Sequence, residues 1–112
     1  LTMEQFAKPQ SFSFNSMNLD KSSALLDFDA LSFPLTLRKW KPGDRFRPLG
    51  MKGFKKISDF LIDEKVARNE KENTFVLTSN EEVIWVIGHR IDDRFKVGKD
   101  TQIMYLARLH NP

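Results

Sequence analysis

The sequence lacks cysteine altogether and has no long hydrophobic run. Without thiols, the chain can form neither disulfides nor thiolate metal sites, which fits a reducing compartment. No apolar stretch approaches the roughly 18 residues of a membrane span, and the N-terminus does not have the pattern of a signal peptide. We therefore expect a soluble, cytoplasmic domain with no membrane partner.

Residues that could carry covalent chemistry are scarce as well. His89 and His110 are the only histidines, and their separation does not match a metal-binding motif. No serine lies in a nucleophile elbow, and Gly43, Gly50 and Gly53 fit neither the Walker spacing nor the dinucleotide spacing. We expect neither catalytic residues nor a metal or cofactor site in this chain.

Positive charge is concentrated in one segment. The whole chain of 112 residues carries a formal net charge of +3. The basic segment contains Arg38, Lys39, Lys41, Arg45, Arg47, Lys52, Lys55 and Lys56, with Asp44 as the only acid among them. The rest of the chain is therefore acidic on balance. Such clustering is typical of a polyanion-binding surface.

Turn-forming residues divide the basic segment. Pro42-Gly43-Asp44 favours a turn, because proline fixes one backbone dihedral and glycine admits a positive φ. Gly50 and Gly53 interrupt the residues that follow. We expect Gly43, Asp44, Gly50 and Gly53 to shape the loop. The Asp44 carboxylate could accept backbone amides in an Asx-type turn and hold Arg45 in place.

A helix is predicted over residues 55–64. One buried face is indicated by the spacing of Phe54, Ile57, Phe60 and Leu61. Lys55 and Lys56 would then lie in the first turn, where the helix macrodipole disfavours positive charge. Either these lysines solvate an exposed helix end, or they join the helix amides and the preceding glycine loop as a seat for a phosphate.

The remaining pattern predicts strands joined by polar connections. Strands are expected at residues 24–28, 33–38, 75–78, 83–87 and 101–109, with an edge strand at 12–14 and a helical turn within 65–73. Together they predict an α+β domain, a small and mostly antiparallel sheet or sandwich with one main helix. Residues 1–23 are expected to lead in from a preceding domain, and residues 24–112 to form the domain itself.

Aromatic residues interleave with the bases and allow two interpretations. Trp40, Phe46 and Phe54 could stack on bases, as aromatic residues do in single-strand binding proteins. Core packing is the commoner fate of such residues, and we expect it for Phe46 and Phe54, while Trp40 stays open. Trp85 lies within an apolar run and should be buried.

An acidic pair lies between two arginines near the C-terminal end. Asp92 and Asp93 are flanked by Arg90 and Arg94. A carboxylate pair could bind a hard cation or share a proton. The flanking arginines favour a different interpretation, in which the carboxylates form ion pairs with them and orient them.

Several spaced blocks together resemble a known family. They are the series LRKWKPGDRFRPLGMKGFKKISDFLIDEKVARNEK, the later series VIWVIGHRIDDRFKV, and Thr101. From about residue 24 to residue 109 the chain is similar to the C-terminal domain of bacterial tRNA(Ile)-lysidine synthetase. One departure is Ala67, where the family often has proline. The resemblance implies a fold related to a domain of the phenylalanyl-tRNA synthetase β chain.

The resemblance implies a tRNA-modifying ligase that uses ATP to join lysine to the wobble cytidine of an isoleucine tRNA. In this family, a Ser-Gly-Gly-x-Asp-Ser loop in an N-terminal catalytic domain holds the nucleotide. The present chain has no such loop, so ATP with magnesium would belong to the missing catalytic domain. The resemblance implies that the C-terminal domain binds the acceptor stem of the tRNA. It also implies contact with the catalytic domain of the same polypeptide, and a homodimer is a further option.

The residues and the resemblance together predict an RNA-binding surface. The expected backbone contacts are Arg38, Lys39, Arg45, Lys52, Lys55 and Lys56, joined by Arg90, Arg94 and Lys96 if the connection over residues 88–97 folds beside the basic loop. Two alternatives stay open. The domain could dock on its own catalytic domain without touching RNA, or it could bind single strands generally, which would require Trp40 and Phe46 to be exposed.

Overall fold

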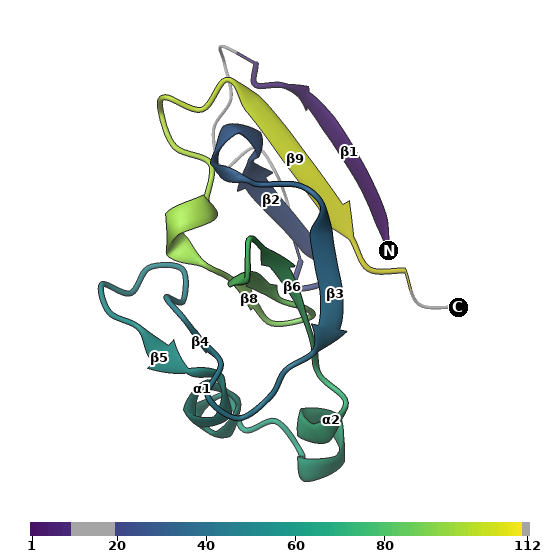
Figure 1. The fold of residues 1–112 in the computed structure, drawn as a ribbon, viewed down its shortest axis with the longest axis vertical. Helices are drawn as coiled ribbons and strands as arrows, with labels where there is room; N and C mark the ends of the chain where they lie inside the picture. Colours follow the sequence, from purple (N-terminus) through teal and green to yellow (C-terminus); the bar gives the residue numbers. More distant parts are fainter. Residues whose placement is uncertain (10–19, 111–112) are drawn as a thin grey trace.

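The computed structural model describes residues 1–9 and 20–110 (Figure 1). These residues form three sheets, and all of the paired strands are antiparallel. The first sheet has the order β1 (Thr2–Ala7), β9 (Ile103–Arg108) and β2 (Ser23–Asp27). The second has the order β3 (Leu35–Lys39), β6 (Phe75–Ser79), β7 (Glu82–Val86) and β8 (Arg90–Ile91), and the third pairs β4 (Arg45–Phe46) with β5 (Lys55–Lys56).

Four short helices complete the described part of the chain. They are α1 (Ile57–Asp63), α2 (Arg68–Glu72) and the 3-10 turns η2 (Phe28–Ala30) and η3 (Asp93–Phe95). The predicted α+β class with mostly antiparallel sheets is confirmed. Among the described residues, no helix has the length and apolar character needed to cross a membrane.

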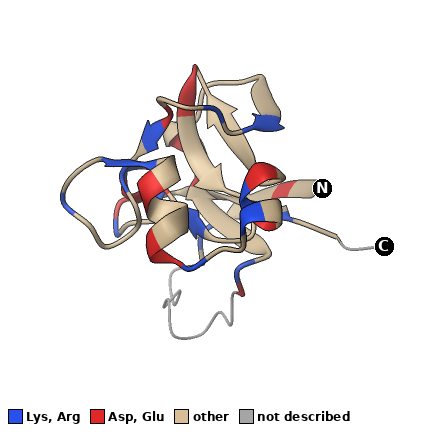
Figure 2. Cartoon of the chain, turned by 90° about the horizontal axis from the view of Figure 1, so that it is seen from below, with Lys and Arg blue, Asp and Glu red and all other residues tan. Residues whose placement is uncertain are grey.

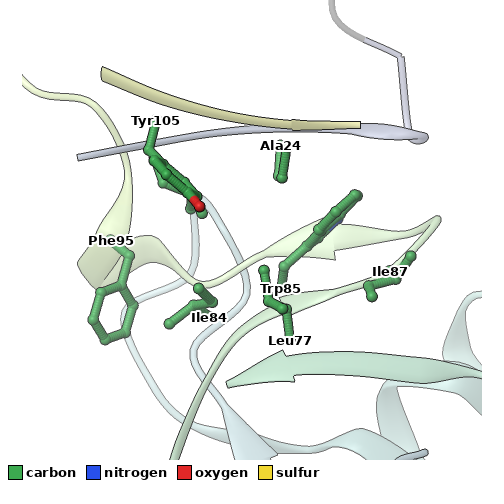
Figure 3. Packing of buried hydrophobic residues seen from close by; sticks show 9 residues of the cluster. Ala24, Leu77, Ile84, Trp85, Ile87, Phe95 and Tyr105 are labelled. Atoms are coloured by element: carbon green, nitrogen blue, oxygen red, sulfur yellow. The ribbon is translucent and has the colours of Figure 1, made fainter. Parts of the chain in front are cut away.

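The main core lies between the two larger sheets. Tyr105 of β9 and Ala24 of β2 point down from one sheet, and Trp85, Leu77 and Ile84 come from β7 and β6 of the other (Figure 3). Trp85 is only 1% exposed, as the apolar run around it predicted. Burial of these apolar surfaces holds the two sheets together.

A second cluster attaches α1 and β4 to the outer face of the second sheet. Phe46 is completely buried and meets Phe60 of α1 edge to face, with ring centroids 5.0 Å apart. Ile57 and Leu61 of the same helix pack with Val76, Val83 and Val86 of β6 and β7. The apolar face of α1 therefore fixes the base of the β4–β5 hairpin on the domain.

Most of the predicted strands are confirmed, but the helix begins later than expected. Lys55 and Lys56 form β5 and pair with Phe46 and Arg45 of β4, so neither lysine lies in the first turn of α1. The amide of Ile57, the first helical residue, donates to the carbonyl of Asp44 over 3.0 Å. Pairing with a strand ten residues earlier therefore overrides the local helix pattern. Phe54 lies outside the helix, and its assignment to the buried face was wrong.

The N-terminal residues take part in the first sheet. Thr2–Ala7 pairs with β9 along its whole length, from Thr2 opposite Arg108 to Ala7 opposite Ile103. This part of the expected lead-in thus belongs structurally to the domain, whereas the preceding domain itself stays a prediction. The edge strand expected at residues 12–14 lies outside the described residues.

Candidate nucleic-acid interface

We call residues 41–56 the basic hairpin. It consists of the turn at residues 41–44, strand β4, a connection over residues 47–54, and strand β5. Figure 2 shows this connection extending away from the body of the domain at the left of the view, with Lys and Arg along it. The charged segment singled out in the sequence therefore forms a projecting structure rather than a flat face.

Asp44 closes the turn at the start of the basic hairpin. Its carboxylate accepts two hydrogen bonds from the guanidinium of Arg38, over 2.8 and 3.0 Å, and one from the amide of Lys41 over 2.8 Å. Gly43 adopts the positive φ of 95° that this turn requires. The carboxylate thus shapes the loop as expected, but the side chain it holds is that of Arg38, where Arg45 was predicted.

The surroundings of Asp44 favour its ionised form. Burial alone would raise the pKa of the carboxyl, but hydrogen bonds from Arg38 and from the Lys41 amide outweigh burial and lower the pKa below its usual value. The same ion pair raises the pKa of Arg38. Much of the Arg38 charge is therefore already compensated within the protein.

Asp92 anchors the middle of the basic hairpin. Its side chain is 0% exposed and accepts hydrogen bonds from the amide of Arg47 over 2.8 Å and from Arg94 Nε and Nη2 over 3.0 Å each. The amide of Asp93 donates to the carbonyl of Arg47 over 2.7 Å, and the amide of Leu49 donates to the carbonyl of Ile91 over 3.0 Å. The connection over residues 88–97 therefore lies beside the basic hairpin. This is the arrangement that the sequence required for Arg90, Arg94 and Lys96 to join the basic surface.

Asp93 holds the next turn of the same hairpin. Its carboxylate accepts from the amide of Gly50 and from Nζ of Lys96, each over 3.1 Å, and lies 3.6 Å from the Arg47 guanidinium. The bond from the Gly50 amide is the largest cause of a lowered pKa for Asp93. Gly50 has a φ of 88°, which favours glycine at this position. Both carboxylates of the acidic pair thus fix hairpin backbone.

Many of the bases expected to contact RNA form ion pairs within the domain. Arg90 pairs with Glu64 over 2.9 Å, and not with the acidic pair as predicted. Arg94 pairs with Asp92 over 3.0 Å, which agrees with the prediction, and also with Glu82 over 2.9 Å. Lys96 pairs with Asp93. Lys55 of β5 pairs with Asp63, the last residue of α1.

The remaining expected bases are exposed. They are Lys39, Arg45, Lys52 and Lys56, and none of them forms an ion pair within residues 1–9 and 20–110. Nζ of Lys39 donates to the amide oxygen of Asn73 over 3.3 Å. A phosphate seat was expected around Gly53 to Ile57. The amide of Ile57 is not free to bind a phosphate there, because it donates to the carbonyl of Asp44. These four side chains, together with Lys41, carry the uncompensated positive charge of the hairpin region.

The aromatic residues divide differently from the prediction. Phe46 is buried as expected, but Phe54 is 57% exposed, so its assignment to the core was wrong. Cζ of Arg94 lies 4.8 Å from the Phe54 ring centroid. Trp40 is half-buried, and its Nε1 donates to the carbonyl of Lys71 over 2.6 Å. The sequence offered one signal for Phe54, its position between Gly53 and two lysines.

The described residues offer little for covalent chemistry. Within them, no three His, Asp or Glu side chains are grouped to hold a metal ion. His89 is half-buried, and burial lowers its pKa. It lines a hollow of about 470 Å³ together with the charged Lys21, Arg90 and Lys96 and the apolar Leu49 and Trp85. What the arrangement supports is binding of an anion or polyanion by the basic hairpin.

A family description matches the greater part of the chain. The model of the TilS substrate C-terminal domain family covers residues 35–108. The tRNA(Ile)-lysidine synthase of Parabacteroides distasonis is 52% identical over 83 residues, which are 74% of this chain and 19% of that protein. That of Bacteroides thetaiotaomicron is 40% identical over 90 residues, covering 80% of this chain and 21% of that protein. The chain thus spans about a fifth of these curated relatives.

Two solved structures share the fold at low sequence identity. The crystal structure of a TILS C-terminal domain superposes with a TM-score of 0.72 at 18% identity, covering 98% of this chain and 85% of that one. An N-terminal fragment of the phenylalanyl-tRNA synthetase β-subunit from Pyrococcus horikoshii superposes with a TM-score of 0.60 at 19% identity, covering 75% of this chain and 26% of that one. At these identities the likeness concerns the fold.

Proposed function

This chain belongs to the TilS substrate C-terminal domain family, and on that premise we propose that it is the tRNA-binding domain of a tRNA(Ile)-lysidine synthetase. The intact enzyme would act in the cytoplasm as an ATP-dependent ligase that attaches lysine to the wobble cytidine of isoleucine tRNA. ATP and magnesium would bind in its catalytic domain. The role of the present domain would be to hold the acceptor stem of the tRNA.

The observation that carries this proposal is the set of uncompensated bases on a braced hairpin. Arg45, Lys52 and Lys56 project from one hairpin, whose backbone is fixed by the buried carboxylate of Asp92 and by Asp93. A-form RNA offers proteins its phosphates, 2′-hydroxyls and a shallow minor groove. Exposed cations on a fixed backbone suit phosphate binding, because the backbone that carries them does not have to be ordered when the RNA binds.

The nine expected contact residues divide into two roles in this proposal. Lys39, Arg45, Lys52 and Lys56 contact phosphates directly. Arg38, Lys55, Arg94 and Lys96 add positive potential and hold the hairpin in shape through their carboxylate partners. Arg90, which pairs with Glu64 outside the hairpin, adds positive potential only. Gly43, Asp44, Gly50 and Gly53 shape the loop that presents these bases.

Binding of the 112-residue chain to an acceptor-stem minihelix of isoleucine tRNA tests the proposal. A shuffled stem of the same length and composition is the matched control, and affinities are measured over a salt series. Two results together support acceptor-stem recognition. The logarithm of the association constant should fall linearly with the logarithm of the salt concentration, with a slope that corresponds to several phosphate contacts, and the cognate stem should bind more tightly than the shuffled one. Affinity weaker than about 0.1 mM for both stems contradicts it.

A second function is favoured by apolar side chains on the same hairpin. Leu49 and Met51 are exposed beside the bases, and such residues often mark protein contacts. The hairpin would then dock on the catalytic domain of the same polypeptide without touching RNA. Weak, salt-sensitive RNA binding without preference between the two stems would favour this function. A homodimer stays a prediction, which sedimentation of the chain would test.

A further inference from the structure

We propose that Phe54 is a stacking platform for an unpaired base where the RNA duplex ends, such as the first single-stranded nucleotide of the acceptor end. This inference rests on the proposed function and adds a ligand to it. The platform consists of the Phe54 ring, the Arg94 guanidinium beneath it, and the bases that flank it on the hairpin. Its ligand is a planar aromatic base joined to a phosphate.

The Phe54 ring is exposed on a braced part of the chain. It is 57% exposed, although it directly precedes the paired strand β5. A single exposed apolar side chain is common in folded proteins and would not carry an inference alone. Here, however, a charged group fixed by the core covers one side of the ring.

Arg94 is that fixed group. Its Cζ lies 4.8 Å from the centroid of Phe54 and 5.2 Å from that of Phe95, which is buried in the core. Three hydrogen bonds to the carboxylate of Asp92 and one to Glu82 hold its side chain and amide in place. The guanidinium therefore covers one side of the Phe54 ring, and the rest of the ring is exposed.

The surroundings of this ring select a nucleotide. Lys52 and Lys56 are exposed two residues before and two residues after Phe54, and neither forms an ion pair in the described part of the chain. An aromatic ring between such bases can stack on a base while the lysines contact the adjoining phosphates. Bases inside a duplex are stacked on both faces. The ring can therefore reach only an unpaired or terminal base.

The test compares two RNAs that differ in one feature. One is the blunt acceptor-stem duplex, and the other is the same duplex with an unpaired 3′ extension whose first nucleotide is 2-aminopurine. Affinity and 2-aminopurine fluorescence are measured for the unaltered chain, for Phe54→Ala and for Phe54→Trp. Phe75→Ala, which removes another exposed phenylalanine on β6, is the matched control.

Stacking predicts a loss confined to the extended RNA. Phe54→Ala should weaken binding of the extended duplex about tenfold and abolish the fluorescence quenching, while leaving the affinity for the blunt duplex unchanged. Phe54→Trp should retain both, and Phe75→Ala should behave like the unaltered chain. The salt slope should be the same for all four, because no charge changes.

The outcomes separate this inference from the function on which it rests. If the unaltered chain binds both duplexes and Phe54→Ala matches it in affinity and quenching, the stacking inference fails and duplex binding stands. An equal loss on the blunt duplex would make Phe54 part of the duplex contact and would also overturn stacking. If the unaltered chain binds neither RNA, both proposals fail.

Discussion

The carboxylate of Asp92 is completely buried, while the guanidinium of Arg94 that it binds through two of its nitrogens remains partly exposed. The same carboxylate accepts the backbone amide of Arg47 in the basic hairpin. One buried charge thus links the core, the hairpin backbone and the arginine beneath Phe54. This link explains how a projecting loop with many like charges can keep a defined shape.

Removal of this carboxylate should destabilise the domain. Asp92→Ala leaves the Arg47 amide without its partner and the Arg94 guanidinium with Glu82 alone, and losing one member of a buried pair typically costs about 3–5 kcal/mol. We expect a loss of about 3 kcal/mol in the free energy of unfolding, measured by urea denaturation. Asp100→Ala, at an exposed position, is the control. A loss below about 1 kcal/mol would show that the link is not structural.

The two phenylalanines of the basic hairpin should differ sharply in their effect on stability. Phe46→Ala leaves a cavity against Phe60 in the second core cluster and should cost about 3–5 kcal/mol in the free energy of unfolding. Phe54→Ala should cost less than about 1 kcal/mol, because its ring is mostly exposed. Similar losses in the two variants would mean that Phe54 packs inside the domain.

Acid sensitivity should reveal the Arg38–Asp44 pair. The pKa of Asp44 is lowered in the folded state, so its contribution to stability is full above its ordinary value of 3.8 and is lost as the pH falls through the folded value. Asp44→Asn should be less stable than the unaltered chain at neutral pH. The difference should stay constant down to about pH 5 and shrink below about pH 4. A difference that does not vary with pH would contradict the ion pair.

Charge reversal on the hairpin should weaken RNA binding without unfolding the domain. Lys52→Glu combined with Lys56→Glu removes two exposed bases, so the salt slope should fall by about 2 and the affinity for the minihelix by about tenfold or more. The control pair Lys65→Glu and Lys99→Glu makes the same charge change at exposed positions outside the hairpin. Equal losses in the two double variants would indicate that only net charge matters.

The sequence predicted the fold well where its signals are local. The hairpin of β6 and β7 was expected from the apolar runs at residues 75–78 and 83–87, which flank the polar residues 79–82. In the structure, Asn80 and Glu81 adopt the positive φ of a tight two-residue turn. The start of α1 was not visible, because Lys55 and Lys56 look helical until they pair with β4. A partner strand ten residues away cannot be inferred from periodicity.

The candidate site was predicted only in outline for the same reason. The basic segment was evident from composition, and the bond between Asp92 and Arg94 could be proposed from their neighbourhood in sequence. The pairing of Arg90 with Glu64 depends on tertiary structure. So does the exposure of Phe54, since spacing alone cannot tell which of two phenylalanines on a hairpin faces the core.

An NMR titration tests whether the basic hairpin binds the acceptor stem. The 112-residue chain, labelled with ¹⁵N, is titrated with the unlabelled acceptor-stem duplex, and amide shifts are followed residue by residue. We expect the largest shifts at Arg45, Lys52, Lys56 and their hairpin neighbours, and we expect added salt to reverse them. Shifts confined to β1 or α2, with the hairpin amides unmoved, would contradict binding by the hairpin.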